Sequence, residues 1–192
     1  MKIFISGGCK NGKSTYAQRI AKLQNKHPAP LYYIATMVAS DDEDERRITA
    51  HRKERDGWGF VTIEQPRDIK GIISVCDHSG SFLLESLTAL LANEMFSQKD
   101  AFDGGAYERT AGGLAEIAGK IANIVIVSDF IYSDTGQYGA FTESYRKSLA
   151  ALDCLAAKKC DVVLEASYAC IVFHKGRDLF SGAFGDALGA AF

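Results

Sequence analysis

Residues 7–14 read Gly7-Gly8-Cys9-Lys10-Asn11-Gly12-Lys13-Ser14. This stretch fits the pattern G-x-x-x-x-G-K-[ST] in full, and it lies between the apolar run 3–5 and a helical pattern of apolar residues. Glycines have no Cβ atom, so the backbone N–H groups of such a loop can turn inward around an anion, and the helix that follows adds its positive N-terminal end. We therefore predict a phosphate-binding loop, the P-loop of a nucleotide-binding protein.

Two side chains of this loop have predicted roles in chemistry. Lys13 is expected to reach the β- and γ-phosphates as a catalytic residue, and the hydroxyl of Ser14 is expected to hold Mg²⁺. The alternative is a glycine-rich turn between a strand and a helix that binds nothing. The Lys-Ser pair in the correct strand–loop–helix context favours the nucleotide site.

Composition indicates an ordinary globular enzyme. The chain has 192 residues, of which 47% are hydrophobic and 24% charged, enough for one domain with its own core. A formal net charge of −2 gives no basic footprint for nucleic acid, and no apolar run is long enough for a membrane span. The P-loop begins so early that we expect no signal peptide, and a cytoplasmic protein.

The five cysteines indicate a protein without a disulfide framework. Their number is odd, none forms a C-x-x-C pair, and Cys9 lies inside the phosphate loop. The other four are interpreted as small apolar residues: Cys76, Cys154, Cys160 and Cys170.

Short apolar runs alternate with helical patterns along the chain. After the first strand, strands are expected at 31–35, 60–64, 81–85, 124–128 and 161–165, with helices at about 13–24, 107–120 and 142–157 among others. This alternation predicts a P-loop NTPase-like α/β domain over residues 1–175, with a mostly parallel sheet flanked by helices. A last strand at 169–173 is expected to be antiparallel at an edge. The tail 176–192 is either a packing arm or disordered.

A P-loop enzyme needs an acid near its Mg²⁺, at the end of a neighbouring strand. Glu85 follows the apolar run 82–84 and is our candidate for this metal ligand, together with Ser14. Asp129, at the end of the strand over 124–128, is the competing candidate.

His51 lies in a charged segment, among Arg47, Arg52, Lys53 and Arg55. An imidazole in a positive field can attack phosphorus and carry a nucleotidyl group covalently. From spacing alone, an exposed histidine on a solvated helix is the simpler interpretation. Ser40 or Asp41 is expected to cap that helix, whose first turn is acidic.

An ordered set of motifs resembles one enzyme family, strongly over residues 1–96 and less so over 124–175. The matching features, in chain order, are the P-loop, Tyr33-Ile34-Ala35-Thr36, Asp41-Asp42-Glu43, Arg47-Ile48, His51-Arg52, Trp58, Glu64, Leu84-Glu85, Thr88 and Asn93. The chain is thereby similar to the bifunctional adenosylcobinamide kinase/adenosylcobinamide-phosphate guanylyltransferases of cobalamin biosynthesis.

The resemblance implies a two-step transferase that uses GTP and ATP. It implies phosphorylation of adenosylcobinamide, with ATP and GTP both open as donors, and then GMP transfer from GTP through a catalytic histidine, here His51. It implies a nucleotide site made of residues 7–14, Thr36, Arg52, Lys53, Glu54, Arg55, Glu64 and Glu85. It also implies a homo-oligomer, a trimer in the well-known case.

The chain departs from the family pattern in its second half. Asp129-Phe130-Ile131-Tyr132 stands where the family usually has Asn-Glu-Val-Gly, and Asp153-Cys154 stands where it usually has Asn-Gln. Two alternatives therefore stay open: a related kinase or nucleotidyltransferase with another acceptor, and a catalytically silent nucleotide-binding paralogue. The presence of both Lys13 and His51 counts against the silent paralogue.

Overall fold

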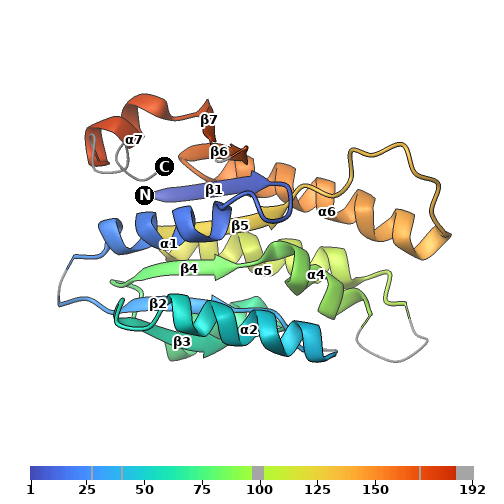
Figure 1. Cartoon of the computed structure of the whole chain (residues 1–192), viewed down its shortest axis with the longest axis horizontal. Coiled ribbons are helices and arrows are strands. Elements are labelled where there is room, and N and C mark those ends of the chain that lie inside the picture. The colour runs from blue at the N-terminus through green and yellow to red at the C-terminus, as the bar shows by residue number, and fades with distance from the viewer. Residues whose placement is uncertain (27, 40, 97–101, 169, 185–192) are drawn as a thin grey trace.

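The computed structural model describes residues 1–26, 28–39, 41–96, 102–168 and 170–184. Its centre is a seven-stranded sheet in the order β3-β2-β4-β5-β1-β6-β7 (Figure 1). The strands are β1 (Lys2–Gly7), β2 (Leu31–Ala35), β3 (Phe60–Glu64), β4 (Ser81–Glu85), β5 (Asn123–Asp129), β6 (Val162–Ser167) and β7 (Cys170–Lys175). Neighbouring strands are parallel except for the β6–β7 pair. The mostly parallel sheet and its antiparallel edge strand are confirmed.

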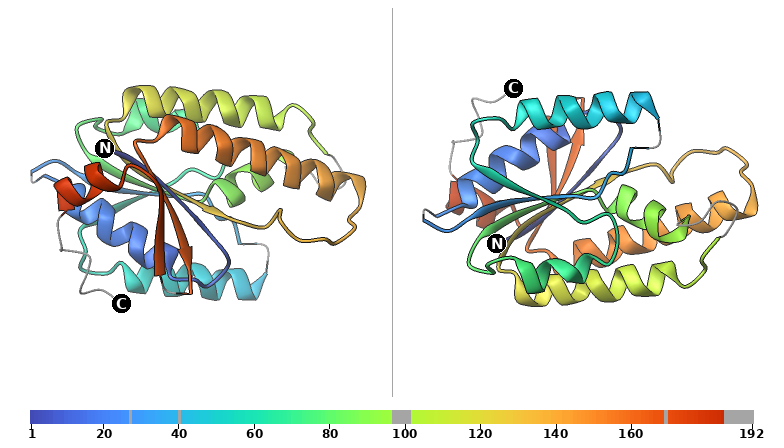
Figure 2. Two further views of the ribbon diagram at one scale, coloured as in Figure 1. Left: turned by 90° about the horizontal axis from the view of Figure 1, so that it is seen from above. Right: turned by 90° about the horizontal axis from the view of Figure 1, so that it is seen from below.

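Helices cover both faces of the sheet. They are α1 (Lys13–Gln24), α2 (Asp42–Glu54), α3 (Ile72–Val75), α4 (Leu87–Met95), α5 (Ala106–Lys120), α6 (Ala140–Lys159) and α7 (Arg177–Phe184), with a 3₁₀ turn η1 (Ile69–Gly71) before α3. Figure 2 shows α1 and α2 on one side of the strands and α5 and α6 on the other. Because both faces are covered, the central strands are apolar throughout rather than alternating.

The core is split by the sheet into two layers, because successive side chains of a strand point to opposite faces. On one side, Ile3 and Ile5 pack with Ile20 of α1. On the other, Phe4 and Phe82 pack with the helices α3 to α6. Each fully buried side chain of this size contributes about 1.5–3 kcal/mol of transfer free energy, so the strand that ends in the P-loop is firmly held.

The P-loop lies where the direction of the chain across the sheet changes. From β1 the chain crosses to β2, on one side of β1 in the sheet. Later it passes from β5 to β6, on the other side, so β1 lies between β5 and β6. Parallel strands place their carboxyl ends along one edge, and ligands of open α/β sheets bind outside such a switch point. The loop after β1 therefore opens at the usual ligand edge of this fold.

Two expectations from sequence need correction or refinement. Cys154 and Cys170 are exposed rather than buried, since each faces solvent from a helix or an edge strand, whereas Cys76 and Cys160 are in the core. The tail contains a helix, α7, which packs on the α1 side of the sheet through Phe180, 4% exposed. Residues 185–192, and residues 97–101 of the connection before α5, lie outside the described residues. None of the described helices has both the length and the hydropathy needed to cross a bilayer.

Candidate nucleotide-binding site

The backbone of the predicted phosphate loop has the conformation that its glycines allow. Gly12 has a φ of 80° and directly precedes α1, and Lys10 also lies in the left-handed region, with a φ of 58°. A Cβ atom on Gly7 would lie 2.5 Å from the carbonyl oxygen of Ala166 in β6. Gly7 is therefore required by the close packing of β1 against β6, and Gly12 by the turn into the helix.

Lys13 is held inside the loop. Its side chain is buried, donates a hydrogen bond from Nζ to the Gly8 carbonyl oxygen at 3.1 Å, and forms an ion pair with Asp129 Oδ1 at 2.5 Å. Asp129 ends β5, and the parallel register places it beside Gly7 of β1. The loop lysine is thus held inside the loop that is predicted to bind phosphate, with a carboxylate as its partner.

Glu85, the other predicted acid, lies one strand further away, because β5 separates β4 from β1. It is on the same face of the sheet as Asp129, and its Oε2 accepts a hydrogen bond from the Tyr33 hydroxyl at 3.1 Å. Mg²⁺ prefers oxygen ligands and is usually held by one or two protein groups and by substrate phosphates. A half-buried Ser14 hydroxyl in the first turn of α1 and the Glu85 carboxylate fit that donor set.

A cationic group, Arg55, is buried against Tyr33, the residue whose hydroxyl binds Glu85. Arg55 is 7% exposed, and its guanidinium stacks on the Tyr33 ring, with Cζ 3.5 Å from the ring centroid. Its Nη1 has no hydrogen-bond partner in the described part of the chain. Burying an unpartnered charged group is costly, so such groups in folded proteins usually serve a ligand. The predicted nucleotide residue Arg55 therefore has an unused donor and lies on the tyrosine that hydrogen-bonds Glu85.

Helix α2 carries the predicted catalytic histidine. The side chain of Asp41 caps it by accepting a hydrogen bond from the Asp44 N–H at 2.9 Å, and four acidic residues in its first turn favour the helix dipole. His51 lies in this helix, but its side chain and that of Glu54 lie outside what the structure describes. Within α2, no side chain that the structure does describe is buried.

Three other predicted residues have partners that are already in place. Arg52 Nη2 pairs with Glu64 Oε1 at 2.6 Å, and both side chains are largely exposed. The neighbouring predicted residue Lys53 faces solvent. Thr36 is fully buried: its hydroxyl donates to the Ser86 carbonyl oxygen at 2.9 Å and accepts from the Ser86 N–H at 2.6 Å. Thr36 thus ties the end of β2 to the end of β4.

Sequence reasoning did not assign a role to Tyr33, although this residue connects Arg55 to Glu85. The available signal was a tyrosine inside an apolar strand, because a buried phenol needs a hydrogen-bond partner. It also did not foresee that Asp129 would pair with Lys13, because this contact depends on which strand lies beside β1.

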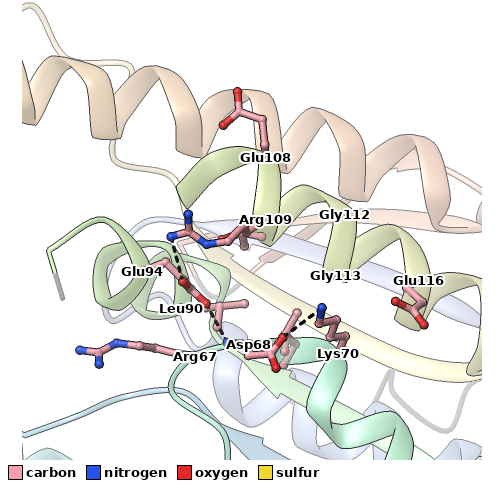
Figure 3. A pocket seen from close by; sticks show the side chains of 12 residues that line it. Arg67, Asp68, Lys70, Leu90, Glu94, Glu108, Arg109, Gly112, Gly113 and Glu116 are labelled. Carbon is pink, nitrogen blue, oxygen red and sulfur yellow. Dashed lines mark hydrogen bonds and ion pairs between the residues drawn. The ribbon is translucent and has the colours of Figure 1, made fainter. Parts of the chain in front are cut away.

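A separate cavity of about 590 Å³ lies between η1, α4 and α5. Figure 3 shows Glu94 near its centre, where it pairs with Arg109 at 3.5 Å and accepts a hydrogen bond from the Asp68 N–H at 2.7 Å. None of the predicted nucleotide residues lines this cavity. Its acids and bases largely satisfy one another, so its described groups do not form a second phosphate site.

Comparison with known proteins identifies the family. Residues 3–169 match the model of the family described as cobinamide kinase/cobinamide phosphate guanyltransferase. The chain is 28% identical over 164 residues to the bifunctional adenosylcobalamin biosynthesis protein CobP of Pseudomonas aeruginosa, with 85% of this chain and 91% of that protein aligned. It is 30% identical over 129 residues to the bifunctional adenosylcobalamin biosynthesis protein CobU of Escherichia coli K12, covering 64% of this chain and 67% of that protein.

Among solved structures, a KaiC-like protein of Pyrococcus horikoshii aligns over 92% of this chain and 79% of its own, with a TM-score of 0.47 and 10% identity. The family match spans the P-loop, α2 and the strands that carry Glu85 and Asp129. This chain belongs to the cobinamide kinase/cobinamide phosphate guanyltransferase family.

Proposed function

We propose that this chain catalyses two successive transfers to adenosylcobinamide. In the first, the hydroxyl oxygen of the aminopropanol arm attacks the γ-phosphorus of a nucleoside triphosphate, the bond to the β-phosphate oxygen breaks, and the nucleoside diphosphate leaves. In the second, a nitrogen of His51 attacks the α-phosphorus of GTP and pyrophosphate leaves. A phosphate oxygen of cobinamide phosphate then displaces the histidine, which gives adenosylcobinamide-GDP.

The observation that carries the proposal is the buried Lys13 inside a complete P-loop, in a chain that matches the family over residues 3–169. Phosphoryl transfer depends mainly on positioning and on fixed positive groups around the phosphate oxygens. Lys13 and the N-terminus of α1 would supply those groups at the γ-phosphate. Arg55, with its unused Nη1, would supply another donor for the nucleotide.

Ser14 and Glu85 would hold Mg²⁺ at the same edge. Bound there, the ion would neutralise charge on the phosphate oxygens. Tyr33 orients the Glu85 carboxylate through its hydroxyl, and Asp129 is engaged by Lys13. Because Asp129 is already paired with Lys13, we favour Glu85 over Asp129 as the metal ligand.

The direct test is incubation of the purified protein with Mg²⁺ and GTP labelled at the α-phosphate, with no acceptor present. We expect label that stays on the protein through denaturation, is lost in acid and is absent from His51→Ala. Adding adenosylcobinamide phosphate should then move the label to the corrinoid. GTP binding without any label on the protein would contradict the guanylyl-histidine step. The remaining possibilities would then be a kinase that lacks the second step or a silent nucleotide-binding paralogue. The family matches favour neither of them.

We also propose that the protein acts in the cytoplasm as a homo-oligomer, a trimer by family resemblance. Analytical ultracentrifugation should then give a single species of about three chains. A monomer at micromolar concentration would contradict this part of the proposal.

A further inference from the structure

A buried carboxyl group, that of Asp153, lies against the chain segment that carries Asp129, the partner of Lys13. Asp153 of α6 is 3% exposed, and its Oδ1 accepts no hydrogen bond from the described residues. No lysine or arginine is among the described groups that act on it. A buried carboxylate without a cation is costly, so this environment favours the neutral acid.

Asp153 contacts the chain on both sides of Asp129. The Tyr132 hydroxyl donates to Asp153 Oδ2 at 3.0 Å, and the Ser128 hydroxyl also faces this carboxyl. Side chains alternate along β5, so Ser128 points to the α6 side while Asp129 points to the P-loop side. One carboxyl group therefore clamps the segment 128–132, whose acid pairs with Lys13.

Thr88 of α4 completes this polar cluster. Its Oγ1 accepts a hydrogen bond from the Asp129 N–H at 2.7 Å and lies 3.4 Å from Ser128 Oγ. The Tyr145 hydroxyl donates to the Thr88 carbonyl oxygen at 2.9 Å. The backbone of Asp129 is therefore fixed from α4, while its flanking residues are fixed from α6.

We propose that Asp153 is a positioning residue: as the neutral acid it clamps residues 128–132 and holds Asp129 in register with Lys13, and its ionisation weakens triphosphate binding. The inference rests on the proposed function only in taking Lys13 as a triphosphate ligand.

Burial is the main cause that raises the pKa of Asp153, to about 7. The Ser128 and Tyr132 hydroxyls act in the opposite direction, and the nearby Asp129 carboxylate adds a smaller upward contribution. The other titratable groups that face it are phenols. Burial raises the pKa of Tyr132 and of Tyr145, so both stay neutral through the physiological range. Above about pH 7, Asp153 therefore gains a negative charge beside Asp129, which lowers the positive potential that Lys13 presents to phosphate.

The test compares the wild type with Asp153→Asn and with a control, Asp178→Asn, which changes an exposed acid of α7. GTP affinity is measured by calorimetry from about pH 6 to about pH 8.5. We expect the wild type and the control to lose affinity roughly tenfold more over this range than Asp153→Asn, whose amide cannot ionise. Comparing variants cancels the titration of GTP and of every ionisable group that all three proteins share. Equal pH profiles in all three would overturn the proposal.

A second measurement does not depend on GTP or on the stability of a variant. The infrared difference spectrum of the wild type between low and high pH should contain the carbonyl band of a protonated carboxyl group that disappears near neutrality. Asp153→Asn should lack this band. In Tyr132→Phe the midpoint should move to higher pH, because a hydrogen bond to the carboxylate is lost. An Asp153 carboxyl group that stays ionised over the whole pH range would contradict the proposal that it acts as the neutral acid.

The two readouts separate this inference from the proposed function. GTP affinity can be measured without a corrinoid and without guanylylation of His51. A pH effect specific to Asp153 in a protein that never labels His51 would therefore reject the guanylyl transfer and keep the clamp. Labelling of His51 with no Asp153-specific pH effect would reject the clamp alone.

Discussion

The two halves of the proposed nucleotide site are held in different ways. The P-loop follows a central strand, its lysine is 6% exposed, and Lys13 has two partners within the described chain. Helix α2, which carries His51, has no buried side chain among those described and depends on its own caps and first-turn charges. Among the described residues, the buried anchor of this helix is its C-cap Arg55, which stacks on Tyr33.

This difference matches two separate requirements of the proposed reaction. Phosphate chemistry needs donors that are fixed before the nucleotide binds, and packing against the sheet provides them. A group that carries GMP from one substrate to another needs access to both, and an exposed helix provides that. Substitutions in the P-loop half should therefore reduce catalysis at every step, whereas those in the α2 half should reduce one step and leave stability unchanged.

The largest effect is expected for Lys13→Ala. Removing a fixed donor to the transferring phosphate typically costs roughly 10²–10³-fold in kcat. Phosphorylation of adenosylcobinamide and labelling by GTP should both fall, as measured by product formation at saturating nucleotide. Lys26→Ala, an exposed lysine after α1, is the control and should change neither rate. Undiminished activity in Lys13→Ala would exclude the P-loop as the active site.

His51→Ala should remove one step completely and leave the fold intact. We expect no guanylyl label. Because none of the described α2 side chains is buried, we also expect a change in the free energy of unfolding within about 0.5 kcal/mol. Urea unfolding and α-labelled GTP measure the two quantities. Thr49→Ala, exposed on the same helix, should keep the label. A large loss of stability in His51→Ala would show that α2 is packed more tightly than its described residues indicate.

Arg55→Met tests the anchored end of α2. The thioether keeps much of the side-chain volume but removes the charge, so GTP affinity should fall by about tenfold or more, the value of a charge-assisted hydrogen bond. Stability should be unchanged or higher, because a buried guanidinium with an unpartnered Nη1 carries a desolvation cost. Calorimetry and thermal unfolding provide the measurements. A loss of about 3 kcal/mol or more with unchanged affinity would make Arg55 a structural residue.

Glu64→Gln should have the smallest effect on folding. It breaks the pair with Arg52, but both side chains are more than half exposed, and such pairs contribute about 0–1 kcal/mol. The free energy of unfolding from urea titration should therefore change by less than about 1 kcal/mol. GTP affinity should decrease if Glu64 binds the nucleotide, as the resemblance predicts. An unchanged affinity would remove Glu64 from the site.

Several features followed from local pattern alone. The P-loop, its strand and α1 were predictable because glycine spacing, an apolar run and a helical period are all short-range signals, and α1 begins and ends at the predicted residues. The parallel sheet followed from the alternation of strands and helices. The family followed from the order of its motifs along the chain, which needs no knowledge of contacts.

The contacts within the site were decided by tertiary structure. Asp129 rather than Glu85 meets Lys13 because β5 lies beside β1 and its register sets Asp129 against Gly7, a pairing across more than a hundred residues. Arg55 and Asp153 are charged residues in the sequence, yet the fold buries both, one against Tyr33 and the other against the connection after β5. Sequence alone determined which chemical groups this protein has and which short elements carry them. Strand order and burial decided which groups meet and in what charge state, because both depend on long-range packing.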